Sequence, residues 1–225
     1  MIVAYQPFQI IPLHRHAQAY AAFVCEGGYF EFGPDGRWLC QPGDVVMHPR
    51  LDVHADRFNH RGGKVLDAPV LTGAPTCFCV LRPQNAEEVF RAMVRNEMTD
   101  AAAHLLQMSA LVPPLEAPPG LETARKILSG PESTTLVRVA NAIGQSREHV
   151  TRRFREWFGM TPGEFRREHR LRRALQAIDH GQRLAMAAAE AGYADQAHMT
   201  RSLRSSLGVT PGSLQAGKHH TCSKH

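Results

Sequence analysis

The chain has 225 residues, of which 43% are hydrophobic, and a formal net charge of +5 at pH 7. This length suits two modest domains with separate cores, and the apolar content argues against a disordered chain. No apolar run approaches the roughly 20 residues of a membrane span, and the first ten residues lack the features of a secretory signal, so we expect neither a membrane protein nor a secreted one. Five cysteines without a framework spacing are typical of reduced thiols, which predicts a cytoplasmic protein.

The net charge hides an asymmetry between the two halves of the chain. Residues 1–119 carry nine Lys or Arg against twelve Asp or Glu, a balance of −3, whereas residues 120–225 carry seventeen against nine, a balance of +8. A polyanion is the expected partner of a strongly basic domain. The second half is therefore the candidate for nucleic-acid binding.

Residues 1–83 contain short apolar runs that are separated by turn signals. The runs are YAAFVCE, YFEFG, RWLCQ, VVMHP and CFCVL, and the first four are divided by GG, PDG and PGD. Short strands at regular spacing, with Gly, Pro and Asp in the turns, predict an antiparallel sandwich or barrel.

Two histidine motifs lie in the same region, HRH at residues 14–16 and GDVVMHPRLDVH at residues 43–54. They resemble the two short motifs of the cupin barrel, which bring two histidines of one strand and one of a later strand into a single pocket. The matching residues are His14, His16 and His54. Because side chains two apart on a strand share a face, His14 and His16 are expected to point to the same side. The resemblance implies a cupin-like β-barrel over residues 1–83 that serves as an effector or sensor domain.

Three imidazoles can hold Zn, Ni, Fe or Mn, and such a divalent metal is the cofactor that the resemblance implies. The sequence departs from the cupin metal pattern, however, because Tyr20 and Ala21 stand where a carboxylate is expected. Two interpretations stay open, a metal site or structural and effector-contacting histidines, and we favour the second. His48 and Trp38 are expected to line the same pocket.

Residues 84–111 change to helical spacing, which predicts a helical hairpin. Its first helix runs through Val89, Phe90 and Met93, and its second through Leu105, Leu106 and Ala110. These side chains either supply a dimer contact or cover the open face of the barrel. The segment that follows, LVPPLEAPPG, contains four prolines and predicts a semi-rigid linker over residues 112–120.

The basic half contains an internal sequence repeat. Residues 149–162 read HVTRRFREWFGMTP and residues 198–211 read HMTRSLRSSLGVTP, with seven of fourteen positions identical at an offset of 49. Each copy predicts an amphipathic helix with apolar residues on one face and arginines on the other. A shorter helix precedes each copy, and Gly144 and Gly192 mark the turns between. A helix, a glycine turn and a second helix form the layout that presents the second helix to the DNA major groove.

Two details of spacing refine this prediction. Thr161, Pro162 and Glu164 form the signature of a capping box with proline at the first helical position, so a long helix should start there and join the two units. The offset is 48 between Leu136 and Leu184, before the turns, and 49 after them, so the second turn should hold one extra residue.

Residues 121–215 resemble the DNA-binding domain of the AraC/XylS family of bacterial transcription regulators. The segments that carry the resemblance are LVRVANAIGQSREHVTRRFREWFGMTP and GYADQAHMTRSLRSSLGVTP. Leu203, Ser205 and Leu207 depart from the family pattern, which usually has Phe, a basic residue and Phe there. The fold class expected for the whole chain is multi-domain α and β: the cupin-like antiparallel barrel and its helices, then an all-α double helix-turn-helix, then a disordered tail over residues 216–225.

In the resembling family, the two recognition helices enter successive major grooves. The residues expected to read base edges are Glu148, Thr151 and Arg152 in the first copy and Gln196, His198, Thr200 and Arg201 in the second. The residues expected to contact phosphates are Arg147, Arg153, Arg155 and Arg204.

These patterns predict a sequence-specific transcription regulator of the AraC/XylS type, modulated by an effector through the cupin-like domain, and not an enzyme. The expected partners are promoter DNA, a small-molecule effector and RNA polymerase, with the chain acting as a homodimer or a monomer. The alternative is a metal-dependent cupin enzyme or metal sensor fused to a DNA-binding domain. Only the three histidines support this alternative. A third interpretation gives the barrel no ligand and a purely dimerising role.

Overall fold

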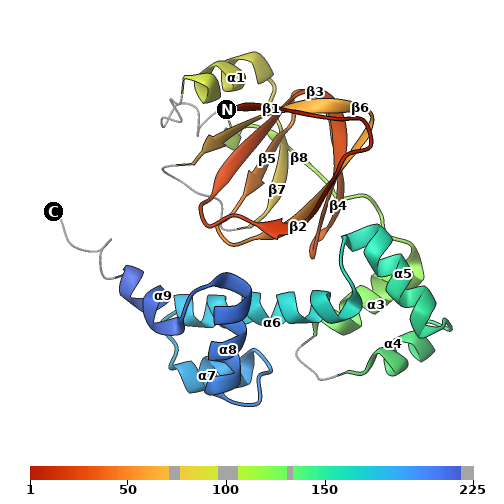
Figure 1. Ribbon diagram of the computed structural model, residues 1–225, viewed down its shortest axis with the longest axis vertical. Helices are drawn as coiled ribbons and strands as arrows, with labels where there is room; N and C mark the ends of the chain where they lie inside the picture. Colours follow the sequence, from red (N-terminus) through yellow and green to blue (C-terminus); the bar gives the residue numbers. More distant parts are fainter. Residues whose placement is uncertain (71–76, 96–105, 131–133, 219–225) are drawn as a thin grey trace. The chain divides into compact units, whose positions relative to one another are not determined.

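The computed structural model describes residues 1–70, 77–95, 106–130 and 134–218 (Figure 1). The chain divides into two compact units, of which the first covers Met1–Ala117 together with Arg155–Met160 and the second covers Pro118–Phe154 and the residues from Thr161 onward. Among the described residues, no helix combines the length and the apolar character needed to cross a membrane.

The first unit is an antiparallel sheet built around two long strands, β3 (Tyr20–Gly33) and β6 (Val53–Pro69), which pair along their length. On the free edge of β6 lie β1 (Ile2–Tyr5) and β2 (Ile10–Arg15). On the free edge of β3 lie β4 (Gly36–Cys40) and β5 (Val45–His48), and β7 (Cys79–Arg82) and β8 (Ala110–Val112) extend the sheet beyond β5. The predicted antiparallel β-domain ahead of a helical domain is confirmed.

The glycine pair at residues 27 and 28 lies inside β3 rather than in a turn, so the expected separation of YAAFVCE from YFEFG is wrong. The pairing of β3 with β6 shifts register on both sides of this pair, as in β-bulges. Gly27 has a φ of +75°, and a Cβ there would lie 2.0 Å from the carbonyl oxygen of Gly62. The glycines thus let two backbones approach closely where the long strands bend.

The two faces of the bent sheet carry different side chains. The inner face holds an apolar cluster that includes Val24, Tyr29 and Trp38. The outer face packs against α1 (Ala86–Val94), whose Val89 and Met93 are buried. The outer cluster contains Val89, Met93 and Leu106, with Phe90 partly buried against it.

The hairpin expected over residues 84–111 is therefore confirmed only for its first helix. Its described apolar side chains cover the sheet, which is one of the two roles considered for them. Ala110 is not helical but begins β8, because residues 110–112 pair with β7 and complete the sheet. Leu105 lies outside the described residues.

The second unit consists of helices (Figure 1). They are α3 (Pro119–Ser129), α4 (Leu136–Ala142), α5 (Arg147–Phe158), α6 (Pro162–Asp179), α7 (Leu184–Glu190), α8 (Gln196–Leu207) and α9 (Pro211–Lys218). The pair α4 and α5 has 7 and 12 residues, and so does the pair α7 and α8. The connection between the helices of a pair is residues 143–146 in the first copy and residues 191–195 in the second, which confirms the extra residue.

Local signals at the helix ends act as the sequence predicted. Gly144 and Gly192 have φ values of +64° and +79° in the two turns. Thr161 accepts a hydrogen bond from the backbone N–H of Glu164, whose carboxylate accepts one from the N–H of Thr161, so the capping box is present. α9 continues to Lys218, so the first three residues of the predicted disordered tail are helical, while residues 219–225 lie outside the described part.

Each copy has its own apolar core. In the first, Val150 and Phe154 of α5 are fully buried, and the ring of Phe154 meets that of Phe165 of α6 edge-on at 5.4 Å. In the second, alanines dominate the helix contacts, since the small side chains allow close approach. The buried residues of the second core are Leu171, Ala174, Ala177, Ile178, Ala187, Ala188, Ala191, Tyr193, Met199 and Leu203. Both copies are thus seated on the single long helix α6.

Candidate nucleic-acid interface and histidine cluster

The predicted reading face of α5 is accessible. Its apolar residues point into the core, which leaves the opposite face to polar side chains. Arg147, Glu148, Arg152 and Arg155 are exposed, whereas Thr151 and Arg153 are half-buried. Five of the six can therefore present a charge to a ligand from one helix.

The predicted reading face of α8 is equally accessible. Gln196, His198, Arg201 and Arg204 are exposed and Thr200 is half-buried. Burial of Met199 and Leu203 fixes the rotation of the helix, because these two face the core. All predicted DNA-contacting residues thus lie at accessible or half-accessible positions of two matched helices.

Each reading helix is fixed at its N-terminus by a capping side chain. Ser146 Oγ accepts a hydrogen bond from the N–H of His149 at 3.2 Å, and Asp195 Oδ1 accepts one from the N–H of His198 at 2.6 Å. Beside the first cap, helix-end hydrogen bonding to Glu148, followed by the contributions of Ser146 and Arg147, lowers the pKa of the Glu148 carboxyl. Glu148 is therefore an anionic acceptor, as a cytosine amino group requires.

The equivalent threonines are oriented in the same way. The hydroxyl of Thr151 donates to the carbonyl of Arg147 at 2.8 Å, and the hydroxyl of Thr200 donates to the carbonyl of Gln196 at 2.9 Å. With the hydroxyl proton held by the helix, each threonine offers its methyl group and an acceptor lone pair outward. The two copies differ beside them, because Arg152 lies 2.9 Å from His149 Nδ1, a contact between side chains that fixes its guanidinium.

Comparison with known proteins bears on this part of the chain. The helix-turn-helix domain family matches residues 139–217, which span the second helix-turn-helix and nearly all of the first. These residues form an AraC-type helix-turn-helix domain. The chain is accordingly a DNA-binding transcription regulator, and DNA is its partner. A search of curated proteins finds no match.

Three solved structures illustrate the similarity. An AraC-type regulator from Chromobacterium violaceum is 23% identical over 44% of this chain and 92% of its own, with a TM-score of 0.41. ToxT from Vibrio cholerae is 6% identical over 96% of this chain and 97% of its own, with a TM-score of 0.45. The DNA-binding domain of AdpA, solved in complex with a target DNA, is 20% identical over 48% of this chain and 100% of its own, with a TM-score of 0.43.

The first unit brings the three predicted histidines together. His14 and His54 are paired across β2 and β6, and His16 follows the end of β2. The Nε2 atoms of His14 and His16 lie 3.1 Å apart, and one ring nitrogen of each of the three lies within 4.8 Å of the others. The expectation that the HRH histidines share a side is confirmed.

Four further residues belong to this cluster, and the sequence motifs indicated only His48 among them. The ring of His48 stacks on Tyr20 at 4.4 Å and lies 4.2 Å from the ring of His54. Tyr20, which occupies the expected carboxylate position, has its hydroxyl 3.1 Å from His54 Nε2. Carboxylates come instead from Glu31 of β3 and Asp56 of β6, which face each other in the sheet register. No local motif could have found them, because their proximity depends on strand pairing.

Burial decides the protonation of the inner members of the cluster. It lowers the pKa of His48 to about 3, with neighbouring histidines adding to the effect, and it lowers the pKa of His54 strongly for the same reasons. Burial, followed by the negative charge of Asp56, raises the pKa of Glu31 well above its usual value. Both inner histidines are therefore neutral imidazoles, which is the form that binds metal ions.

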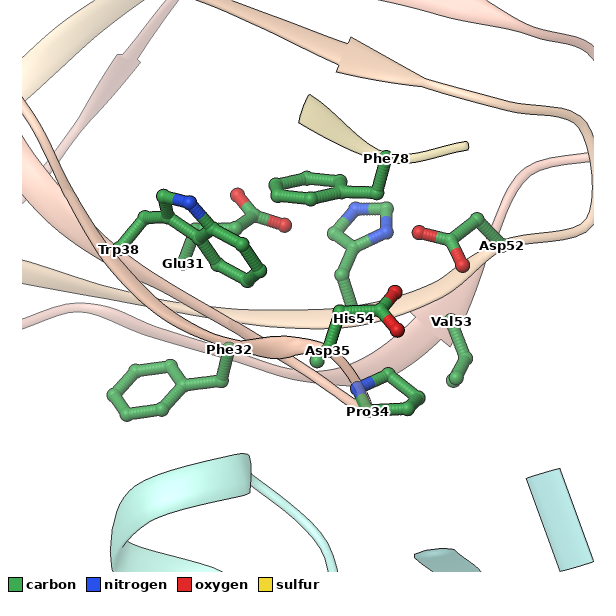
Figure 2. Close-up of a pocket in the computed structure, with 10 residues that line it drawn as sticks. Glu31, Phe32, Pro34, Asp35, Trp38, Asp52, Val53, His54 and Phe78 are labelled. Atoms are coloured by element: carbon green, nitrogen blue, oxygen red, sulfur yellow. The ribbon is translucent and has the colours of Figure 1, made fainter. Parts of the chain in front are cut away.

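A pocket of about 170 Å³ opens beside the cluster (Figure 2). Figure 2 shows the carboxylate of Glu31 between Trp38 and Phe78, and the ring of His54 between Phe78 and Asp52. Of the two residues expected to line the pocket, Trp38 is among the lining residues and His48 is not.

Proposed function

We propose that the chain reads promoter DNA with α5 and α8 in two successive major grooves. The observation that carries this proposal is the duplication of a 7-residue helix, a turn and a 12-residue helix on both sides of one uninterrupted helix. The spacer α6 has 18 residues and is about 27 Å long at 1.5 Å per residue. Groove centres on one face of a duplex lie roughly 34 Å apart. A rigid spacer of that order supports simultaneous docking of both helices.

Within this proposal, the outward side chains divide into two roles. We assign the reading of base edges to Glu148, Thr151, Arg152, Gln196, His198, Thr200 and Arg201, and the contacts to phosphates to Arg147, Arg153, Arg155 and Arg204. Arginine can fork to the O6 and N7 of guanine, and glutamine can pair with adenine, whereas phosphate contacts fix the register.

The β-domain is proposed to sense an effector at the cluster containing His14, His16 and His54. Effector binding would shift the population of conformers in which both reading helices reach their grooves, alone or as a homodimer, and thereby the recruitment of RNA polymerase. We assign sensing rather than catalysis to this domain, because the helix-turn-helix match gives the chain a DNA-binding role that an effector can modulate. A regulator of this kind acts in the bacterial cytoplasm.

Selection of random duplex DNA by the purified full-length chain tests the proposal. We expect an enriched site with two blocks of specified bases about one helical turn apart. The matched control is the double variant Arg152→Ala/Arg201→Ala, checked by circular dichroism, which should enrich neither block. Enrichment of a single block, or of no sequence at all, would refute the two-groove proposal.

A further inference from the structure

Two buried ring nitrogens on the inner side of the histidine cluster have no hydrogen-bond partner among the described residues: Nδ1 of His48 and Nδ1 of His54. The carboxyl group of Glu31 lies with them and shares a hydrogen bond with Asp56. The side chains of Glu31, His48 and His54 are buried, with only 1%, 2% and 2% of their surface exposed. An unsatisfied buried polar group destabilises the fold, and native proteins keep few of them. Choosing another histidine tautomer does not help, because Nδ1 needs a partner with or without its proton.

These three side chains converge from three different strands. Glu31 comes from β3, His48 from β5 and His54 from β6, and one ligand atom of each lies within 4.8 Å of the other two. Zinc ligands lie about 2.0–2.2 Å from the ion, so the ligand atoms of a tetrahedral site are about 3.3–3.6 Å apart. The three side chains would therefore have to move together by up to about 1.5 Å to close around one ion.

The surroundings orient these ligands as metal sites usually do. The hydroxyl of Tyr20 lies 3.1 Å from Nε2 of His54, so Nδ1 is the ring nitrogen left for a ligand. A metal-bound histidine typically engages its other nitrogen with an oxygen in this way. Asp56, opposite Glu31 in the register, adds negative charge that favours a cation.

The outer histidines differ in this respect. Nδ1 of His14 lies 2.9 Å from the carbonyl oxygen of Pro12, which leaves its Nε2 to accept a hydrogen bond from Nε2 of His16 at 3.1 Å. This pair is satisfied by its own tautomers and needs no ion. Among these histidines, His48 and His54 are the ones whose Nδ1 atoms lack partners.

We propose that Glu31, His48 and His54 bind one divalent first-row transition-metal ion, and that this ion is the effector of the regulator. The donor set of two imidazoles and one carboxylate suits Zn²⁺, Fe²⁺ and their neighbours rather than Ca²⁺ or Mg²⁺. An ion suits this site, because the pocket beside it encloses no space large enough for an organic molecule. The assignment of the ion as effector rests on the proposed DNA-binding function, whereas metal binding does not.

The test is a titration of the full-length, chelator-treated chain with Zn²⁺ against a chromophoric competitor, and with Co²⁺ followed by its visible absorption. Because the C-terminal tail can itself bind metals, every protein carries four replacements there: His219→Ala, His220→Ala, Cys222→Ser and His225→Ala. The ligand variants are Glu31→Gln and His48→Phe. Their matched controls are Glu26→Gln, an exposed carboxylate on the same strand, and His60→Ala, an exposed histidine of β6.

We expect one ion per chain, with ligand-field absorption of bound Co²⁺. Loss of an orienting partner alone weakens metal binding 10–100-fold, so each ligand variant should weaken it by more than about 100-fold, and the controls should not. Zn²⁺ should raise the melting temperature of the parent chain but not of the ligand variants. His48→Phe should fold at least as well as the parent without metal, because it removes a buried Nδ1 that has no partner.

Absence of stoichiometric binding by the parent chain would overturn the proposal. So would metal binding that survives Glu31→Gln and His48→Phe but is lost in the double variant His14→Ala/His16→Ala. Selection of a DNA site by the same preparation separates the two hypotheses: a chain that selects DNA but binds no metal refutes only this inference, and a chain that binds metal but selects no DNA refutes the proposed function.

Discussion

Thr151 and Thr200 occupy equivalent positions of the two reading helices, and each hydroxyl donates to the carbonyl four residues earlier. The neighbouring arginines, Arg152 and Arg201, are both exposed, but a histidine holds the guanidinium of Arg152. Because that contact limits its freedom before DNA binds, Arg152 should lose less side-chain entropy on binding a guanine.

Replacing the two arginines separately should relax the readout of two different blocks of the DNA site. Arg152→Ala and Arg201→Ala should each cost about 1–3 kcal/mol on the selected site, through loss of a bidentate base contact. Binding measured on a set of single-base variants of the site shows which position has become tolerant.

Arg155→Ala serves as the comparison, because Arg155 is exposed on α5 and is assigned to a phosphate. It should weaken binding to all sequences alike and reduce the salt dependence of binding by about one ion. Equal losses on every sequence for all three variants would contradict the division of roles.

Asp67 carries a residue-scale prediction for stability. Its partial burial, with a smaller contribution from the negative charge of Asp56, raises the pKa of its carboxyl to about 6, against the opposing effect of the positively charged N-terminus. The folded chain thus binds this proton more tightly than the unfolded chain. The contribution of Asp67 to the free energy of unfolding therefore falls as pH rises from about 4 to 6. Asp67→Asn cannot ionise, so at pH 7 its free energy of unfolding should exceed that of the parent chain by an amount on the order of 2 kcal/mol. Urea unfolding of both proteins at pH 4 and pH 7 measures this, and a pH-independent difference would be inconsistent with it.

The turn of the first helix-turn-helix carries a prediction at the scale of the element. Gly144 has a φ of +64°, and a Cβ there would meet nothing within 4 Å, so its replacement is a test of backbone strain alone. Gly144→Ala should destabilise the chain by about 1–2 kcal/mol. Gly163→Ala, in the first turn of α6 and also with space for a Cβ, should be neutral or stabilising by about 0.5 kcal/mol. Thermal unfolding compares the two, and equal effects would show that the turn does not require glycine.

The elements that could be predicted from the sequence are those specified by short-range signals. The paired helices, the extra residue of the second turn and the capping box at Thr161 all follow from spacing within a few residues. In the first unit, the sequence did not predict the features that depend on pairing between distant strands rather than on local turn preferences. The glycine pair at residues 27 and 28 looks like a turn, yet strand pairing makes it a bulge. In the sequence, Glu31 is a single acidic residue within an apolar strand, with no sign of a functional role. Only the register of β3 with β6 brings it into the histidine cluster.

On the scale of the whole molecule, the charge asymmetry agrees with the two roles proposed for the units, DNA binding by the basic unit and cation binding by the acidic unit. The basic unit presents its arginines on two helices, and the acidic unit contains a buried cluster suited to a cation. If a bound ion is the effector, metal and DNA must alter each other's affinity by the same factor, which is typically 5–150-fold for such coupling. The Kd for the selected DNA, measured with and without Zn²⁺, and the Kd for Zn²⁺, measured with and without DNA, should change by equal factors. A DNA affinity indifferent to Zn²⁺ would show that the ion is structural.

The central claim is that one rigid spacer holds two reading helices in register with neighbouring grooves. Inserting five base pairs between the two blocks of the selected site tests it most directly, because half a helical turn moves one block to the opposite face of the duplex. Relative to a site whose spacer sequence is changed without a change in length, we expect affinity to fall by about 100-fold or more, as one of two linked contacts is lost. Undiminished affinity for the lengthened site would contradict the account.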